Sequence, residues 1–265
     1  MAGRRRLLTT GRLVDRLRAG GVESPEAEAR WIAQSAGERD VEELVRRRLA
    51  GEPLQYVLGT AAFRRLELRV GPGVFIPRPE TELVAERAMA RLPQGGLLTD
   101  LCTGSGAIAL SVADERPDAR VVASELSPHA WEWAVCNRDS LGLRVDLYRG
   151  DLFAALPVEL AGRVDVVVSN PPYVDPEERS TLPSDVVDHE PEDALFAPGR
   201  GTSVIERIVG EAPRWLRRAG WVVLEIGETQ GETVRTILER EGFADVGIAP
   251  DLNGRDRIAE GRWPG

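Results

Sequence analysis

Cysteine and histidine are scarce in this chain, which has 265 residues and only two of each. Cys102 and Cys136 cannot build a disulfide framework, and the scattered Cys and His residues lack the spacing of a zinc site, so no metal is expected. No apolar run approaches the length of a membrane span, and the N-terminus has no apolar signal core. These absences predict a protein of the reducing cytoplasm with no membrane contact.

Lysine is absent, so every cationic side chain is an arginine. The formal net charge of −9 argues against broad binding to a phosphate backbone, and direct sequence-specific nucleic-acid binding is not expected. The charge is uneven, because residues 1–50 contain eleven Arg and eight acidic residues. We interpret the arginine clusters at 4–6 and 46–48 as solvated faces, with a contact surface for an acidic partner as the alternative.

The composition, 42% hydrophobic and 29% charged, is that of a globular protein long enough for one large α/β domain and a small one. Apolar spacing in 7–18 and 40–50, with a helix start at Ser24-Pro25, predicts a small helical domain over 1–50. Residues 51–80 are interpreted as a connector with a β-hairpin. In it, the alternating residues 63–70 form a strand and 71–76 its partner.

Residues 81–265 are predicted to form the main domain, because strand-like and helix-like segments alternate there. This pattern predicts a Rossmann-like, mostly parallel sheet with helices on both faces. The expected helices lie near 81–91, 106–115, 128–140, 202–218 and 229–241. The expected strands lie near 97–101, 120–125, 145–148, 163–169 and 220–226, with a closing pair at 243–248 and 257–262. The long irregular stretch 174–200 is interpreted as a lid or substrate wall, against a passive insertion.

The tetrapeptide Asn170-Pro171-Pro172-Tyr173 follows the apolar run 164–169, a predicted buried strand. Ligands of open α/β sheets bind at such strand ends. The prolines fix the backbone and remove N–H donors, so the Asn oxygen and the Pro171 carbonyl can pair as acceptors for a planar –NH2 group that the Tyr ring covers. The motif resembles the Asn/Asp-Pro-Pro-Tyr site of methyltransferases acting on amide or exocyclic amino nitrogens. A Pro-rich turn without function is the alternative.

A glycine-rich turn lies upstream, between a predicted strand and a predicted helix, and consists of Cys102, Thr103, Gly104, Ser105 and Gly106. Its glycines allow close approach of a ligand, and the next strand ends in Glu125, a carboxylate suited to a ribose diol. The turn also fits a dinucleotide fingerprint, so NAD binding is a rival. Asp100 favours S-adenosyl-L-methionine, because its carboxylate can meet the ammonium of an amino acid moiety, which a pyrophosphate lacks.

The order of these motifs is that of an amino-methylating class I methyltransferase. More widely, the chain resembles the protein-(glutamine-N5) methyltransferases specific for peptide chain release factors. The segments that carry this resemblance are Gly51 to Tyr56, Phe75 to Glu82, Asp100 to Leu110, Ser169 to Tyr173, Glu190-Pro191 with Ala194-Leu195, and Leu224 to Gly227. The string Ile-Pro-Arg-Pro-Glu-Thr-Glu within them distinguishes this family from DNA adenine methylases.

The resemblance implies methylation, by S-adenosyl-L-methionine, of the glutamine in the Gly-Gly-Gln loop of class 1 release factors. Residues 102–106 would then wrap the methionine part of the cofactor and Glu125 would hold its ribose. Asp151 and Leu152 would lie beside the adenine. Residues 170–173 would bind the target glutamine, with Asn170 contacting cofactor and substrate. The N-terminal domain would help to dock the release factor, and a monomer is expected.

Two departures from the family pattern concern the residues expected to bind the cofactor. Cys102 stands where the family usually has Gly, which is strained if the site needs a positive φ. Glu125 replaces a common Asp. The N-terminal part is also shorter than usual, so a paralogue that methylates another protein amide is the main alternative. An adenine-N6 nucleic-acid methyltransferase, an NAD-dependent dehydrogenase and a non-catalytic protein are further alternatives.

For the reaction, the hypothesis assigns catalysis to Asn170, Pro171 and Tyr173. The Asn170 oxygen and the Pro171 carbonyl would each accept one N–H of the substrate amide and align its nitrogen with the sulfonium methyl. Tyr173 would pack on the amide plane and exclude water. No strong general base is required, because the proton can leave after methyl transfer.

Overall fold

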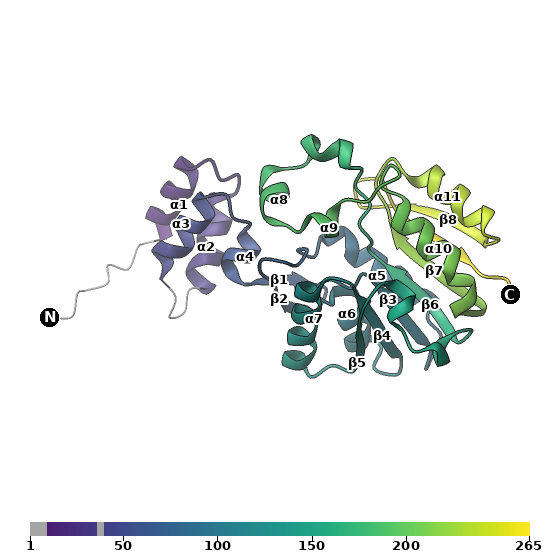
Figure 1. The fold of residues 1–265 in the computed structure, drawn as a ribbon. Helices are drawn as coiled ribbons and strands as arrows, with labels where there is room; N and C mark the ends of the chain where they lie inside the picture. The colour runs from purple at the N-terminus through teal and green to yellow at the C-terminus, as the bar shows by residue number, and fades with distance from the viewer. Residues whose placement is uncertain (1–9, 36–39) are drawn as a thin grey trace.

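The computed structural model describes residues 10–35 and 40–265. The N-terminal helices are α1 (Thr10–Ala19), α2 (Pro25–Ser35), α3 (Val41–Leu49) and α4 (Leu54–Leu58). Leu13, Ile32, Leu44 and Val57 are among the residues of their shared core, and the helices form a separate lobe beside the larger domain (Figure 1). Of the helix predicted over 7–18, the first residues lie outside the described part. The helix α4 was not predicted and lies in the expected connector.

The connector contains a β-hairpin, but not the one that the sequence predicted. Strands β1 (Thr60–Phe63) and β2 (Leu66–Arg69) pair with each other, and residues 71–76 form no strand. The turn falls at Arg64, which has a φ of 52° and whose backbone N–H donates to Glu82 Oε1 at 2.9 Å. Alternation located one strand correctly, but the Gly-Pro-Gly segment was mistaken for the turn. That segment instead runs along α7, where Trp133 Nε1 donates to the Pro72 carbonyl.

The main domain is built on a seven-stranded sheet in the order β5-β4-β3-β6-β7-β9-β8. Its strands are β3 (Leu97–Leu101), β4 (Arg120–Glu125), β5 (Val145–Arg149), β6 (Val164–Ser169), β7 (Leu216–Glu225), β8 (Ala244–Pro250) and β9 (Asp256–Arg262). The first five are parallel, and β9 is antiparallel to both of its neighbours. The predicted mostly parallel α/β fold is therefore confirmed.

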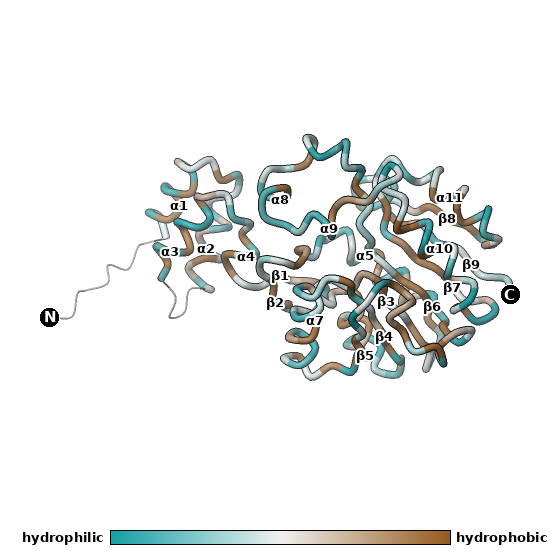
Figure 2. The backbone as a smooth tube through the Cα atoms, viewed as in Figure 1, coloured by the Kyte–Doolittle hydropathy of each residue, from teal (hydrophilic) through white to brown (hydrophobic). Residues whose placement is uncertain are grey.

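Helices cover both faces of this sheet (Figure 1). The helices are α5 (Pro79–Arg91), α6 (Ala107–Glu115), α7 (Pro128–Leu141), α10 (Ser203–Trp215) and α11 (Gly231–Arg240). Residues of α5 and α6 share one core with the sheet, and residues of α10 and α11 share another. Apolar residues accordingly follow the central strands and the inner sides of the helices (Figure 2). Strand β7 begins at Leu216, earlier than predicted, because α10 ends at Trp215 just after its internal Pro213.

The stretch 174–200 contains the 3-10 helix η3 (Pro176–Thr181) and two short helices, α8 (Ser184–His189) and α9 (Glu192–Leu195). It loops between the N-terminal lobe and the sheet, with α9 over the strand ends (Figure 1). The remaining 3-10 helices, η1 (Leu152–Ala155) and η2 (Val158–Leu160), follow β5. Within the described residues, no helix has the length and apolarity to cross a membrane, and no group of side chains has the make-up of a metal site.

Candidate functional site

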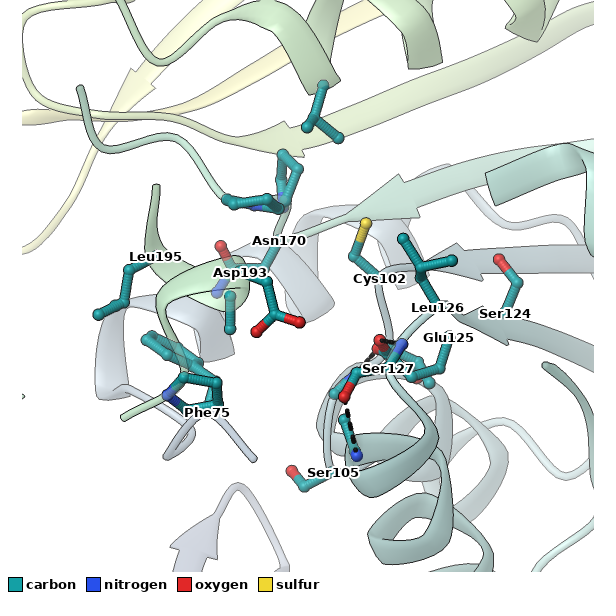
Figure 3. A pocket seen from close by; sticks show the side chains of 18 of the residues that line it. Phe75, Cys102, Ser105, Ser124, Glu125, Leu126, Ser127, Asn170, Asp193 and Leu195 are labelled. Carbon is teal, nitrogen blue, oxygen red and sulfur yellow. Dashed lines mark hydrogen bonds between the residues drawn. The ribbon is translucent and has the colours of Figure 1, made fainter. Parts of the chain in front are cut away.

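A cavity of about 290 Å³ opens at the carboxyl ends of β3, β4 and β6. This is the edge at which ligands of open α/β sheets bind. Its lining comes from the glycine-rich turn, the ends of the strands, the Asn-Pro-Pro-Tyr segment and α9. Phe75, Asn170, Asp193 and Leu195 lie across the cavity from Cys102, Glu125 and Ser127 (Figure 3). The fold thus brings both sequence motifs to one site.

The glycine-rich turn owes its shape to left-handed backbone at alternate positions. Cys102, Gly104 and Gly106 have φ values of 57°, 59° and 86°. A Cβ at Gly106 would also lie 2.8 Å from Leu110 Cδ1, so glycine is required there for two reasons. The condition stated for Cys102 is met, because its φ is positive, so this residue carries the strain of an L side chain in that region. Gly106 caps α6 but does not line the cavity itself.

Asp100 is buried at the end of β3 and has one unsatisfied oxygen. Its Oδ2 accepts from Thr103 Oγ1 at 2.6 Å and from the Ala109 N–H at 3.1 Å. Its Oδ1 has no hydrogen-bond partner among the described residues, although the residue lines the cavity. Burial raises the pKa of Asp100 to about 7, because desolvation penalises the charged form. The residue therefore leaves one buried acceptor oxygen unsatisfied within the described part of the chain.

Glu125 ties the end of β4 to the glycine-rich turn. Its Oε2 accepts from the Gly104 N–H at 2.8 Å and its Oε1 from the Ser127 N–H at 2.8 Å. Burial raises the pKa of this carboxyl, and these backbone donors oppose the shift. Each oxygen keeps a second lone pair, so the carboxylate can still accept from a diol while it holds the turn in place.

The segment after β5 forms another wall of the cavity. Leu152 has a φ of 44° and is buried in the core. It also lines the cavity, where its side chain is aliphatic. Asp151 also lines the cavity, where Arg207 holds its carboxylate at 2.6 Å. Leu126 is 64% exposed and lines the cavity beside them. The sequence analysis missed Leu126 and Arg207, since nothing in their local sequence marks them.

The Asn-Pro-Pro-Tyr segment leaves the sheet after Ser169 and lines the cavity with all four residues. Asn170 Nδ2 donates to Thr81 Oγ1 at 3.2 Å. The Tyr173 hydroxyl donates to Glu225 Oε1 at 3.1 Å and accepts from Arg257 Nη1 at 3.2 Å. Burial raises the pKa of Tyr173, so its hydroxyl stays neutral at physiological pH.

Three of these partners, Thr81, Glu225 and Arg257, were given no role in the sequence analysis. Thr81 and Glu225 do lie within segments that carried the family resemblance, which is the one signal that could have indicated them. Tyr173 was expected to cover a ligand with its ring, and the structure adds that its hydroxyl is anchored behind the site.

The stretch 174–200 forms part of the cavity wall. Asp193, Leu195 and Phe196 line the cavity, and Val174 pairs with Phe196 in an isolated bridge. Glu190 fastens this wall to the connector, since it accepts from the Ile76 N–H at 3.0 Å and pairs with Arg78. Burial raises the pKa of Glu190, while Arg78 opposes the shift. Residues of this stretch therefore contribute to the cavity wall, and its interpretation as a lid or substrate wall stays a prediction.

The chain has clear relatives among known proteins. The family model of the methyltransferase small domain matches residues 71–200. A release factor glutamine methyltransferase of Streptomyces coelicolor is 44% identical over 97% of this chain and 97% of its own length. One from Mycolicibacterium smegmatis is 46% identical over 92% of this chain and 84% of its own. Among solved structures, a methyltransferase from Pyrococcus furiosus shares the fold, with a TM-score of 0.59, 18% identity and coverage of 77% of this chain and 91% of that one.

Proposed function

This chain belongs to the release factor glutamine methyltransferase family, and we propose that its substrate is the glutamine of the Gly-Gly-Gln loop in class 1 peptide chain release factors. The methyl group would pass from S-adenosyl-L-methionine to the side-chain amide nitrogen of that glutamine. The observation that supports the proposal is that Asn170 and Pro171, the predicted acceptor pair, line the same cavity as Asp100, which has one unsatisfied oxygen.

The residues of the glycine-rich turn fit S-adenosyl-L-methionine. The free Oδ1 of Asp100 suits the ammonium of its methionine part, and the spare lone pairs of Glu125 suit the ribose hydroxyls. Leu126 and Leu152 provide apolar surfaces for the adenine. Bound there, the cofactor supplies an electrophilic methyl group. NAD would fit this site less well than S-adenosyl-L-methionine, because its negatively charged pyrophosphate would face the carboxylates of Asp100 and Glu125 and be repelled by them.

The substrate amide needs orientation, because its nitrogen lone pair is delocalised into the carbonyl. Asn170 uses its Nδ2 to reach Thr81, which leaves Oδ1 as the end of the amide that can accept from a ligand. With the Pro171 carbonyl, this oxygen would accept the two N–H groups of the glutamine and favour the positive charge that builds on nitrogen during transfer. The nitrogen would lose its proton afterwards, to water, so this chain's residues hold the amide without deprotonating it first.

Protein docking would involve the N-terminal lobe, which lies beside the wall of residues 174–200 (Figure 1). The cationic surplus of residues 1–50 suits an acidic region of the partner. Another protein amide is the second candidate, because the proposed acceptors at Asn170 and Pro171 would suit the amide group of any such side chain.

The test is a methyl-transfer assay with S-adenosyl-L-methionine and purified class 1 release factor, read by intact mass. A gain of one methyl group is expected on the factor, and none on a factor whose Gly-Gly-Gln glutamine is replaced by alanine. Asn170→Ala should lower kcat by at least about 100-fold, the usual cost of removing a preorganised polar group from such a site. Asn253→Ala, at an exposed position of the turn between β8 and β9, is the matched control. Normal turnover by Asn170→Ala would refute the assigned role.

A further inference from the structure

A chain of buried polar side chains connects Asn170 to the interior of the protein. Asn170 Nδ2 donates to Thr81 Oγ1 at 3.2 Å, and Thr81 Oγ1 donates to Glu225 Oε2 at 2.6 Å. Thr81 is 3% exposed and Glu225 is 1% exposed, so water does not compete for these groups. Thr81 comes from α5 and Glu225 from the end of β7. The three residues meet only through the fold.

The donor and acceptor of each hydrogen bond between Asn170, Thr81 and Glu225 follow from the carboxylate at the end of the series. The Thr81 hydroxyl has only one hydrogen, and it donates this hydrogen to Glu225 Oε2 at 2.6 Å. The lone pairs of Thr81 can then only accept, and the amide group of Asn170 must turn its NH2 toward them. The oxygen of Asn170 is left as the other end of the amide. Since a side-chain amide has two nearly isosteric orientations, something must select one.

We propose that Glu225 and Thr81 are positioning residues that select this orientation and so keep the Asn170 oxygen available to the substrate amide. This inference deepens the proposed function and rests on it, because the amide orientation matters only if the substrate presents N–H groups. Glu225 accepts the hydrogen of the Thr81 hydroxyl, so Thr81 can only accept from Asn170. The NH2 group of Asn170 therefore faces Thr81, and its oxygen faces the cavity.

The surroundings of Glu225 fit the acceptor role. Its second oxygen accepts from the Tyr173 hydroxyl at 3.1 Å, so both oxygens receive a hydroxyl donor. Arg257 lies behind them on β9, where its Nη1 donates to the Tyr173 hydroxyl and to the Ile226 carbonyl. The pKa of Glu225 is raised, mainly by burial and further by the nearby Glu80 carboxylate, although the two hydroxyl donors and the charge of Arg257 oppose the shift.

Replacing Glu225 by glutamine would reverse the chain without changing its shape. The new amide can donate its NH2 to Thr81, whose hydroxyl is then free to donate to Asn170. Asn170 would turn its oxygen toward Thr81 and its NH2 toward the cavity. An NH2 group facing the NH2 of the substrate cannot accept from it, so the residue becomes a poor match for the transition state.

The experiment measures kcat and KM for release-factor methylation, with calorimetric affinity for S-adenosyl-L-methionine, in Glu225→Gln, Thr81→Val and Thr81→Ser. Glu225→Gln should lower kcat about 100-fold while the cofactor Kd stays within about twofold, because Glu225 does not line the cavity. Thr81→Val should also lower kcat, and Thr81→Ser should restore most of it, since serine keeps the hydroxyl. The double variant that combines Glu225→Gln with Thr81→Val should have a kcat no lower than that of the slower of these two single variants, as expected for residues that act as one unit.

Two matched controls separate positioning from packing. Glu260→Gln alters a buried glutamate of β9, in the same sheet as Glu225. Glu260 pairs with Arg91 of α5 and does not line the cavity. Thr99→Val alters a buried threonine whose hydroxyl has no hydrogen-bond partner among the described residues. Both should keep the wild-type kcat. Equal kcat in Glu225→Gln and wild type, failure of Thr81→Ser to restore the rate of Thr81→Val, or multiplicative losses in the double variant would each overturn the inference.

These outcomes also distinguish the inference from the proposed function. If the wild-type enzyme methylates the release factor, the proposed function stands whatever the variants do. If it binds the cofactor but does not methylate the factor, the proposed substrate is wrong. The inference, which rests on that substrate, then falls with it.

Discussion

Cofactor affinity should depend on pH through Asp100, and the structure gives the size of the effect. Asp100 is a buried residue of the cavity wall with a pKa near 7, and one of its oxygens has no hydrogen-bond partner among the described residues. Binding of a cationic ammonium requires its ionised form. About half of the molecules carry that form at pH 7.0 and about 3% at pH 5.5, so the apparent affinity should fall roughly fifteenfold between these values. The fall amounts to about 1.6 kcal/mol.

The sign follows from the direction of the pKa shift. Because the pKa of Asp100 in the free enzyme lies above its ordinary range, the group holds a proton at pH 6 that it must release on binding. Affinity therefore rises with pH up to about 7. Above about pH 8 it should fall again, because the α-amino group of the ligand loses its proton near 7.7–8.0. Binding below pH 7 should release a proton to the buffer.

The assay is isothermal calorimetry of S-adenosyl-L-methionine binding at pH 5.5, 6.0, 6.5 and 7.0, in buffers of different ionisation enthalpy. Asp100→Asn should bind at least about tenfold more weakly at pH 7.0, because an amide cannot replace a charged acceptor. It should also lose most of the pH dependence. Any slope that remains measures Glu125, whose pKa burial also raises.

Asp146→Asn is the control for this series, since that residue forms an exposed salt bridge with Arg120 at 2.9 Å and does not line the cavity. It should keep the wild-type affinity and pH profile. A wild-type Kd that is equal at pH 5.5 and pH 7.0 would refute the reasoning, and so would an Asp100→Asn variant with an unchanged slope.

Two further predictions concern the frame of the site. Cys102→Gly should be more stable than Cys102→Ala by about 1 kcal/mol in urea unfolding, because only the alanine retains a Cβ at a φ of 57°; a more stable alanine variant would contradict strain at this turn. Glu190→Gln should lose the ion pair with Arg78 and loosen the wall, seen as faster hydrogen exchange in residues 191–196 with an unchanged cofactor Kd. Unchanged exchange there would show that the wall holds without this pair.

Much of the fold was accessible from the sequence because its signals are local. The alternation of apolar segments located the strands and helices of the main domain to within a few residues at most ends. The prediction of the hairpin's position was wrong for a physical reason. Arg64 and Arg65 form the turn, and the Arg64 N–H donates to Glu82, whereas the nearby Gly-Pro-Gly has the composition of a turn but packs along α7. Local composition favoured one turn, and a tertiary contact selected the other.

The acceptor site shows where sequence reasoning stops. The acceptor pair, the glycine-rich turn and the carboxylates of Asp100 and Glu125 were predicted, because each belongs to a short motif whose chemistry depends on its own residues. Their roles toward ligands remain proposals. The partners that orient them come from distant parts of the chain, since Thr81 and Glu225 are separated by 144 positions and Tyr173 and Arg257 by 84.

The sequence by itself therefore determined the order of the elements, the strand ends at which the motifs lie and the family of the enzyme. Only the tertiary structure decided which oxygen of Asp100 is left free, that Glu190 fastens the wall, and which way the amide of Asn170 faces. The reason is that backbone conformation and apolar periodicity depend on near neighbours. The direction of a buried hydrogen bond depends instead on every donor and acceptor that packing brings within reach.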